Sequence, residues 1–275
     1  MQNFGGHESD FTDLIQAFSA RGIYLLVCGG TCTDESVVRR VKELGNQRIA
    51  IVLATDSSRP LNCIANHVYR FSVEKSIVNN SVFPMYWVVM PSLAPCPKLA
   101  QPRVTFRGCI THPSRTKGLR ILHSSPLLHC VFDIRPQFWD GSVGNAKSHS
   151  DFVHNMEAGH FAYCPRGAGN FSIRFYEALK AGRIPVVPTS ISLPFPAKIN
   201  WKEYIVLCDT EEDMPSKILE FWSTTNIEER QTACAELFKR EFQTNLVENM
   251  MSEIGVYECV QTEVTAASAN APISS

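Results

Sequence analysis

The chain has 275 residues, of which 44% are hydrophobic and 19% charged, and its formal net charge is −1. This length suits one large domain or two small ones, and the apolar content suffices for a packed core. The chain has no basic excess and its sequence shows no basic stripe, so we do not expect it to bind nucleic acids.

The first ninety residues alternate between helical and extended apolar patterns. Apolar residues recur at helical spacing over 11–18 and again over 34–44. Short apolar runs that are typical of strands buried on both faces occupy 22–30, 48–56 and 67–73. We therefore expect a small α/β lobe with a parallel sheet over residues 1–90.

Residues 91–102, PSLAPCPKLAQP, contain four prolines. A strand or helix does not tolerate that density of proline, so we interpret the segment as a linker between two lobes.

The alternation of strands and helices then starts again, which predicts a second α/β lobe over residues 103–260. Strands are expected at 103–108, 129–135, 160–165, 183–189 and 204–209. Helices are expected at 116–122, 150–158, 172–181, 214–222 and from 227 to about 242. The tail, 261–275, is small and polar, and we expect it to be disordered. In such a protein the cleft between the lobes is the expected ligand site.

Ten cysteines are spread singly through apolar runs, without a C-x-x-C pair. This usage predicts buried thiols in a reducing, cytoplasm-like compartment. A zinc site formed by Cys28, Cys32 and a distant histidine is the alternative. The N-terminal residues lack the pattern of a signal peptide, and the longest apolar runs are too short to span a bilayer, so we expect a soluble chain without a transmembrane segment.

The stretch CPRGAGNFSIRFYEALKAGRIPVV, residues 164–187, combines a glycine-rich turn with a helix start. Ser172 or Asn170 can cap this helix, and the free amides and the helix dipole then form an anion site that suits a diphosphate. Arg174 lies in the first turn, where a cation is unfavourable without an anionic ligand. Glu177, one turn further on, can accept hydrogen bonds from ribose hydroxyls. The alternative is a weak i,i+3 ion pair between Arg174 and Glu177 on an exposed helix.

This part of the chain resembles the core of the exostosin family of glycosyltransferases. The resemblance covers about 103–245 and is strongest over 160–222. Its elements are Cys164–Gly167, Ser172–Ala178, Gly182–Val187, Leu193–Phe195, Ile199–Trp201 and the helix at 215–219, with weaker similarity at Thr105–Gly108, Arg115 and Arg120.

The resemblance implies a GT-B fold, with two Rossmann-like lobes of which the N-terminal, acceptor-side lobe is reduced. It implies inverting transfer of a sugar from a nucleotide-diphosphate donor to a glycan-type hydroxyl acceptor. The donor-binding residues would be Arg107, Gly108, Arg166, Gly167, Asn170, Ser172, Arg174 and Glu177. No Asp-x-Asp pair occurs, so we expect neither a metal nor another cofactor. Many retaining GT-B enzymes have a glutamate at the position of Gly169, which favours inversion here.

An inverting mechanism needs a general base. The candidates are Asp34, Glu35 and Asp56, which follow predicted strands of the first lobe; each is alternatively a helix cap or loop residue. His112 is a further candidate. Two other functions remain alternatives: a catalytically inactive nucleotide-sugar-binding or scaffold protein, and a dinucleotide-dependent oxidoreductase, although Cys28–Cys32 lacks the G-x-G-x-x-G spacing.

Overall fold

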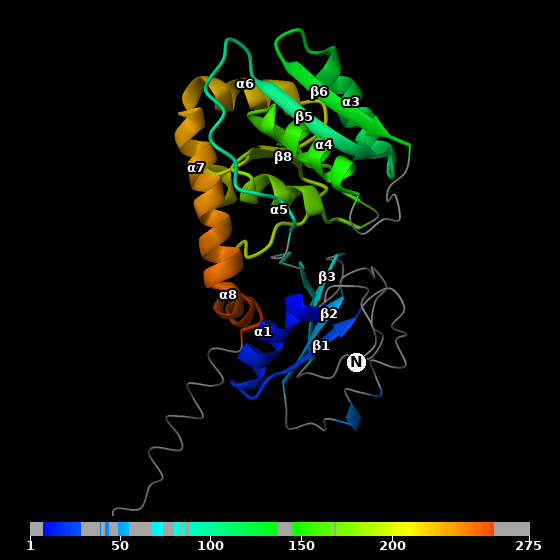
Figure 1. Ribbon diagram of the computed structural model, residues 1–275, viewed down its shortest axis with the longest axis vertical. Helices are drawn as coiled ribbons and strands as arrows, with labels where there is room; N and C mark the ends of the chain where they lie inside the picture. The colour runs from blue at the N-terminus through cyan, green and yellow to red at the C-terminus, as the bar shows by residue number, and fades with distance from the viewer. Residues whose placement is uncertain are drawn as a thin grey trace, which may run out of the picture. The chain divides into compact units, whose positions relative to one another are not determined.

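The computed structural model describes residues 8–28, 39, 42–43, 49–54, 68–73, 80–82, 84–85, 88–136, 145–167 and 169–255. These residues form a mixed α/β structure with two parallel sheets, which confirms the predicted fold class at that level (Figure 1). The chain divides into two compact units. The first contains residues 1–72, 76–83 and 245–275, and the second contains residues 73–75 and 84–244.

The first unit contains a four-stranded parallel sheet in the order β1-β2-β3-β4. Its elements are α1 (Glu8–Ser19), β1 (Tyr24–Cys28), β2 (Ala50–Ala54), β3 (Val68–Ser72), β4 (Asn80–Val82) and α8 (Leu246–Glu253). The first helix and the three expected strands are confirmed, whereas β4 and α8 were not predicted. Of the helix expected over 34–44, only residues 39, 42 and 43 are described, and they are helical.

The chain returns to the first unit at its C-terminal end. Helix α8 contacts α1, and Arg21 forms an ion pair with Glu248 at 2.9 Å. We expected one lobe over 103–260. In the structure, the chain from residue 245 groups with the first unit.

The second unit contains a five-stranded parallel sheet in the order β6-β5-β7-β8-β9. Its strands are β5 (Arg103–Cys109), β6 (His129–Arg135), β7 (Phe161–Tyr163), β8 (Ile184–Pro188) and β9 (Val206–Cys208). Strand β5 comes first in the sequence of this unit, and in the sheet it lies between the next two strands, β6 and β7. This is a doubly wound order, in which the direction of chain progression reverses between β5 and β7, and ligands of such sheets bind beyond the strand ends at that point.

Helices cover both faces of this sheet (Figure 1). They are α3 (Pro113–Ser124), α4 (Ala146–Glu157), α5 (Ile173–Lys180), α6 (Met214–Thr224) and α7 (Ile227–Phe238), followed by a π-helical turn, η2 (Lys239–Thr244). Helices α3 and α6 contact each other, and so do α4 and α5, through Phe152 and Arg174. Gly118 permits a close approach of α3 to the sheet, since a Cβ atom there would lie 2.1 Å from the Tyr163 hydroxyl.

The proline-rich segment 91–102, which we interpreted as a linker, belongs to the second unit and packs on it. Leu93 N donates to Ala181 O at 3.3 Å, and Gln231 bonds both the amide and the carbonyl of Cys96, at 2.7 and 3.0 Å. Proline prevents regular structure here, and groups of the second unit bond the amide of Leu93 and both backbone groups of Cys96.

His160 makes a further link to this segment. It is fully buried; Nδ1 accepts from Arg103 N at 3.0 Å, and Nε2 donates to Pro97 O at 2.9 Å, which requires the neutral ring. Burial lowers the pKa of His160, and the charges of Arg103 and Arg183 lower it further, against the hydrogen bond to Pro97 and the charge of Glu228.

At low pH the unfolded chain binds a proton at this histidine that the folded chain does not. As the pH is lowered from about 6.5, the free energy of unfolding should therefore decrease, by up to about 1.4 kcal/mol per pH unit. Thermal unfolding at about pH 7.5 and pH 5.5 should show a larger drop for the wild type than for His160→Gln. Equal drops in the two proteins would contradict this assignment.

Candidate functional site

The second unit has a gap in strand pairing at the point where strand order reverses. β5 pairs with β6 as far as Cys109, but with β7 only at Val104 and Thr105. Arg103 O accepts from His160 N, so the odd-numbered carbonyls of β5 face the β7 side, since successive residues alternate in direction. The carbonyls of Arg107 and Cys109 therefore face a region that β7 has already left.

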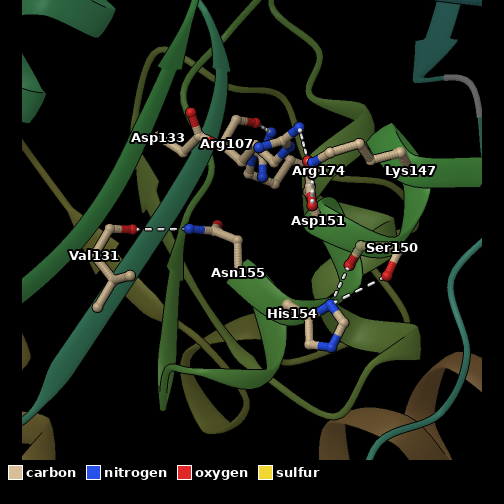
Figure 2. Close-up of polar contacts among 9 residues, drawn as sticks. All are labelled: Arg107, Val131, Asp133, Lys147, Ser150, Asp151, His154, Asn155 and Arg174. Carbon is tan, nitrogen blue, oxygen red and sulfur yellow. Dashed lines mark hydrogen bonds and ion pairs between the residues drawn. The ribbon is translucent and has the colours of Figure 1, made fainter. Parts of the chain in front are cut away.

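Arg174 occupies this gap. It lies in the first turn of α5, is half-buried, and donates from Nη2 to Arg107 O. Its guanidinium carbon lies 4.8 Å from the ring centroid of Phe106 and 5.1 Å from that of Phe152. The side chain of Arg174 thus lies beside Arg107 of β5 (Figure 2). Burial lowers the pKa of Arg174, and the charge of Glu177 opposes this.

Glu177 lies one turn along α5 and is half-buried. Within the described parts of the chain, its carboxylate makes no hydrogen bond and forms no ion pair with Arg174, whose charge acts on it only at longer range. The alternative, an ion pair between Arg174 and Glu177 on an exposed helix, is therefore not observed. Burial raises the pKa of Glu177, and Arg174 opposes this. The carboxylate can accept hydrogen bonds from a ligand.

The start of α5 keeps free amide groups. Ser172 is at the N-cap position, as predicted, but its side chain makes no capping hydrogen bond. In the part of the chain that is described, no acceptor binds the amides of Ile173 and Arg174. The preceding loop is closed by a hydrogen bond from Gly167 N to Phe171 O at 2.9 Å, and Asn170 O accepts from Ser192 N.

Arg107 was expected to line the phosphate side, but its guanidinium is already paired. It forms ion pairs with Asp133 on β6 and with Asp151 on α4, the latter at 3.3 Å, and its side chain is only 11% exposed (Figure 2). The hydrogen bond from Lys147, together with its charge and that of Arg107, lowers the pKa of Asp151. Arg107 therefore contributes its carbonyl, which positions Arg174, and its charge is compensated within the protein.

Gly108 lies directly beside Arg174. A Cβ atom at this position would be 3.2 Å from Arg174 Nη2 and 3.4 Å from the Phe106 ring. At Gly167, by contrast, the nearest atom would be at an ordinary 3.7 Å.

We expect Gly108→Ala to displace the Arg174 guanidinium and to weaken binding of a nucleoside diphosphate by about tenfold, the effect of about 1.4 kcal/mol. Gly167→Ala should change the affinity by less than about twofold, since its added methyl group meets no crowded atom. Calorimetric titration of both variants measures the difference, and equal affinities would show that the side chain of Arg174 is not constrained at Gly108.

Arg115 is brought to the same edge of the sheet, although no role was predicted for it. It lies in the first turn of α3 and donates from Nε to Arg166 O and from Nη1 to Cys109 O, both at 2.8 Å. The available signal was the same as at Arg174: an arginine in the first turn of a helix that directly follows a strand.

The predicted general bases Asp34, Glu35 and Asp56 lie outside the described residues. His112 is the N-cap of α3, where Nδ1 accepts from Ser114 N at 3.2 Å. In the neutral ring this leaves the proton on Nε2, which is then a donor and not a base. His112 thus has a structural role in the helix start.

A hollow of about 820 Å³ lies beside α3, and none of the residues that line it is among those predicted to bind the donor. It is lined by Ile110, Thr111, His112, Pro113, Thr116, Lys117, Arg120, Ile121 and Glu212. The order of the strands and the chemistry of the residues point instead to the gap between β5 and β7.

The described residues contain no helix that is long and apolar enough to cross a bilayer. They also contain no group of three or more His, Cys, Asp or Glu side chains that could hold a metal ion. Six cysteines with described side chains are free thiols, three of them buried and three half-buried.

No family model matches the chain, and no curated protein matches it.

Proposed function

We propose that the chain is an exostosin-like, inverting glycosyltransferase with a GT-B arrangement. It transfers a sugar from a nucleotide-diphosphate donor to a hydroxyl group of a glycan or glycoconjugate. In this proposal the second unit binds the donor, and the first unit supplies the acceptor side and the general base.

The observation that carries the proposal is the position of Arg174 and Glu177. Among the described residues, a cation, two amides without an acceptor and a carboxylate without a hydrogen-bond donor lie near the point where the strand order reverses. The cation and amides suit a diphosphate, and the carboxylate suits the hydroxyl groups of a ribose. This combination of groups matches a nucleotide better than it matches an inorganic anion.

In the proposed reaction, an acceptor oxygen attacks the anomeric carbon of the donor sugar. The bond between that carbon and the diphosphate oxygen breaks, and a base takes the acceptor proton. Arg174 and the amides at the start of α5 stabilise the charge that develops on the leaving diphosphate, and the proposal needs no metal for this.

The role of Glu177 can be tested with ligands that differ in one hydroxyl group. Wild-type protein should bind UDP or GDP about 10- to 100-fold more tightly than the 2′- or 3′-deoxy nucleotide, the range expected for hydrogen bonds to a charged group. Glu177→Ala should reduce this preference to about twofold or less, since no partner for the hydroxyl remains. A preference that survives the substitution would remove Glu177 from the ribose site.

Turnover separates the enzyme from a protein that only binds nucleotide sugars. Purified protein should hydrolyse UDP- or GDP-sugars slowly and release the sugar with inverted configuration. Nucleotide binding without any hydrolysis or transfer, over a panel of donors and glycan acceptors, would favour an inactive binding or scaffold protein.

A further inference from the structure

The guanidinium groups of Arg174 and Arg115 occupy neighbouring positions along one edge of β5. Arg174 donates to the carbonyl of Arg107, and Arg115 donates to that of Cys109. These carbonyls are two residues apart on the side that β7 has left, on the order of 7 Å along the strand. The two arginines come from the first turns of the helices that follow β5 and β7.

Within the described part of the chain, no carboxylate lies within 4 Å of either guanidinium, and both bond only to backbone carbonyls. Arg107, nearby, has two carboxylate partners. Neither helix carries an acidic residue in its first turn. Burial lowers the pKa of Arg115, and the positive charge of Arg174 is the next cause. Each cation therefore destabilises the other, and both oppose a helix dipole.

We propose that Arg115 is a second phosphate-binding residue, so that Arg174 and Arg115 each bind one phosphate group and the site selects diphosphates over single phosphates. This rests on the proposed function, in which Arg174 binds the diphosphate of the donor. A ligand with two linked phosphates removes the repulsion between the guanidiniums and supplies the missing anions.

Arg115 keeps donors for this role. Nε and Nη1 bond to carbonyls, whereas Nη2 lies near Gly167, where a Cβ atom would be 3.8 Å away. The competing explanation is that Arg115 only satisfies the carbonyls of Arg166 and Cys109. The two explanations differ in whether Arg115 distinguishes two phosphates from one.

The test measures the affinities of the complete chain for inorganic pyrophosphate and for orthophosphate, and takes their ratio. Wild-type protein should prefer pyrophosphate by about tenfold or more, the effect of one additional charge-assisted hydrogen bond. Arg115→Gln should reduce this preference to about threefold or less, and Arg115→Lys, which keeps the charge, should give an intermediate ratio. Arg120→Gln is the matched control, because it removes an exposed arginine from the same helix; its ratio should equal that of the wild type.

Only folded protein binds either ligand, so partial unfolding of a variant does not change the ratio of the affinities for pyrophosphate and orthophosphate. If Arg115→Gln does not fold, the ratio of Arg115→Lys tests the inference. A preference that Arg115→Gln retains, or that the wild type lacks, overturns the inference. If UDP binding depends on Arg174 but the preference does not depend on Arg115, this inference alone fails. If the preference depends on Arg115 but neither UDP nor GDP binds, the proposed function fails and the second phosphate contact stands.

Discussion

Replacement of Arg174 by alanine is expected to weaken binding of UDP or GDP by about 30- to 150-fold, which corresponds to about 2–3 kcal/mol for hydrogen bonds to a charged group. The substitution removes the guanidinium that is held between Phe106 and Phe152 at the end of β5. No other described cation bonds to the carbonyl of Arg107, so nothing replaces it.

The fold should tolerate this substitution. Arg174 contributes one hydrogen bond and its contacts with two aromatic rings to the protein, but its charge opposes the dipole of α5. The thermal midpoint should therefore stay within about 4 °C of the wild type. Arg120→Ala serves as the control, since it removes the same charge from an exposed position. An Arg174→Ala protein that is folded and binds nucleotide with unchanged affinity would contradict the account of the site.

Replacement of Arg183 by alanine is expected to destabilise the second unit by about 3–5 kcal/mol. Arg183 is only 1% exposed and lies just before β8. It donates to Met156 O at 3.2 Å, to Ala94 O at 3.1 Å and to Gln231 Oε1 at 3.2 Å. Alanine leaves these acceptors unsatisfied and opens a cavity between segment 91–102 and α7.

Calorimetric unfolding of the complete chain should show the thermal midpoint of the second unit lowered by about 10 °C. Arg183→Lys keeps the charge but not the planar fork, so it should fall between the wild type and Arg183→Ala. A midpoint within about 2 °C of the wild type for Arg183→Ala would mean that water or a rearranged segment 91–102 satisfies the carbonyls.

The helices and strands of the second unit could be predicted because glycines and apolar runs in the sequence mark where they begin and end. The helix expected at 172–181 is observed at Ile173–Lys180, and Gly182 ends it with a φ of 67°. The continuous apolar runs predicted buried strands, such as β8, in which all five residues are buried. Local sequence pattern was sufficient to predict a helix or strand where its structure depends on residues that are near in the sequence.

Long-range pairing was not predictable from local pattern. Arg107 pairs with Asp133 because the register of β5 and β6 places them side by side, and that register depends on the folded sheet. The expectation that Arg107 lines the phosphate side missed this partner. The return of α8 to the first unit and the three-residue strand β4 were missed for the same reason, since short elements carry little periodicity.

The motif residues after β8 have a structural explanation. Trp201 is buried, donates from Nε1 to Pro194 O at 2.9 Å, and packs edge-on against Phe175 of α5. Phe195 stacks on Phe242. These residues support the helix that carries Arg174 and Glu177, so their contribution to the site is indirect.

A crystal structure of the complete chain with bound UDP or GDP tests the central claim most directly. The account predicts phosphate oxygens within hydrogen-bonding distance of the Arg174 guanidinium and of the amides of Ile173 and Arg174, with a ribose hydroxyl on Glu177. A nucleotide bound elsewhere, for example in the hollow along α3, with Arg174 contacting only the carbonyl of Arg107, would contradict it.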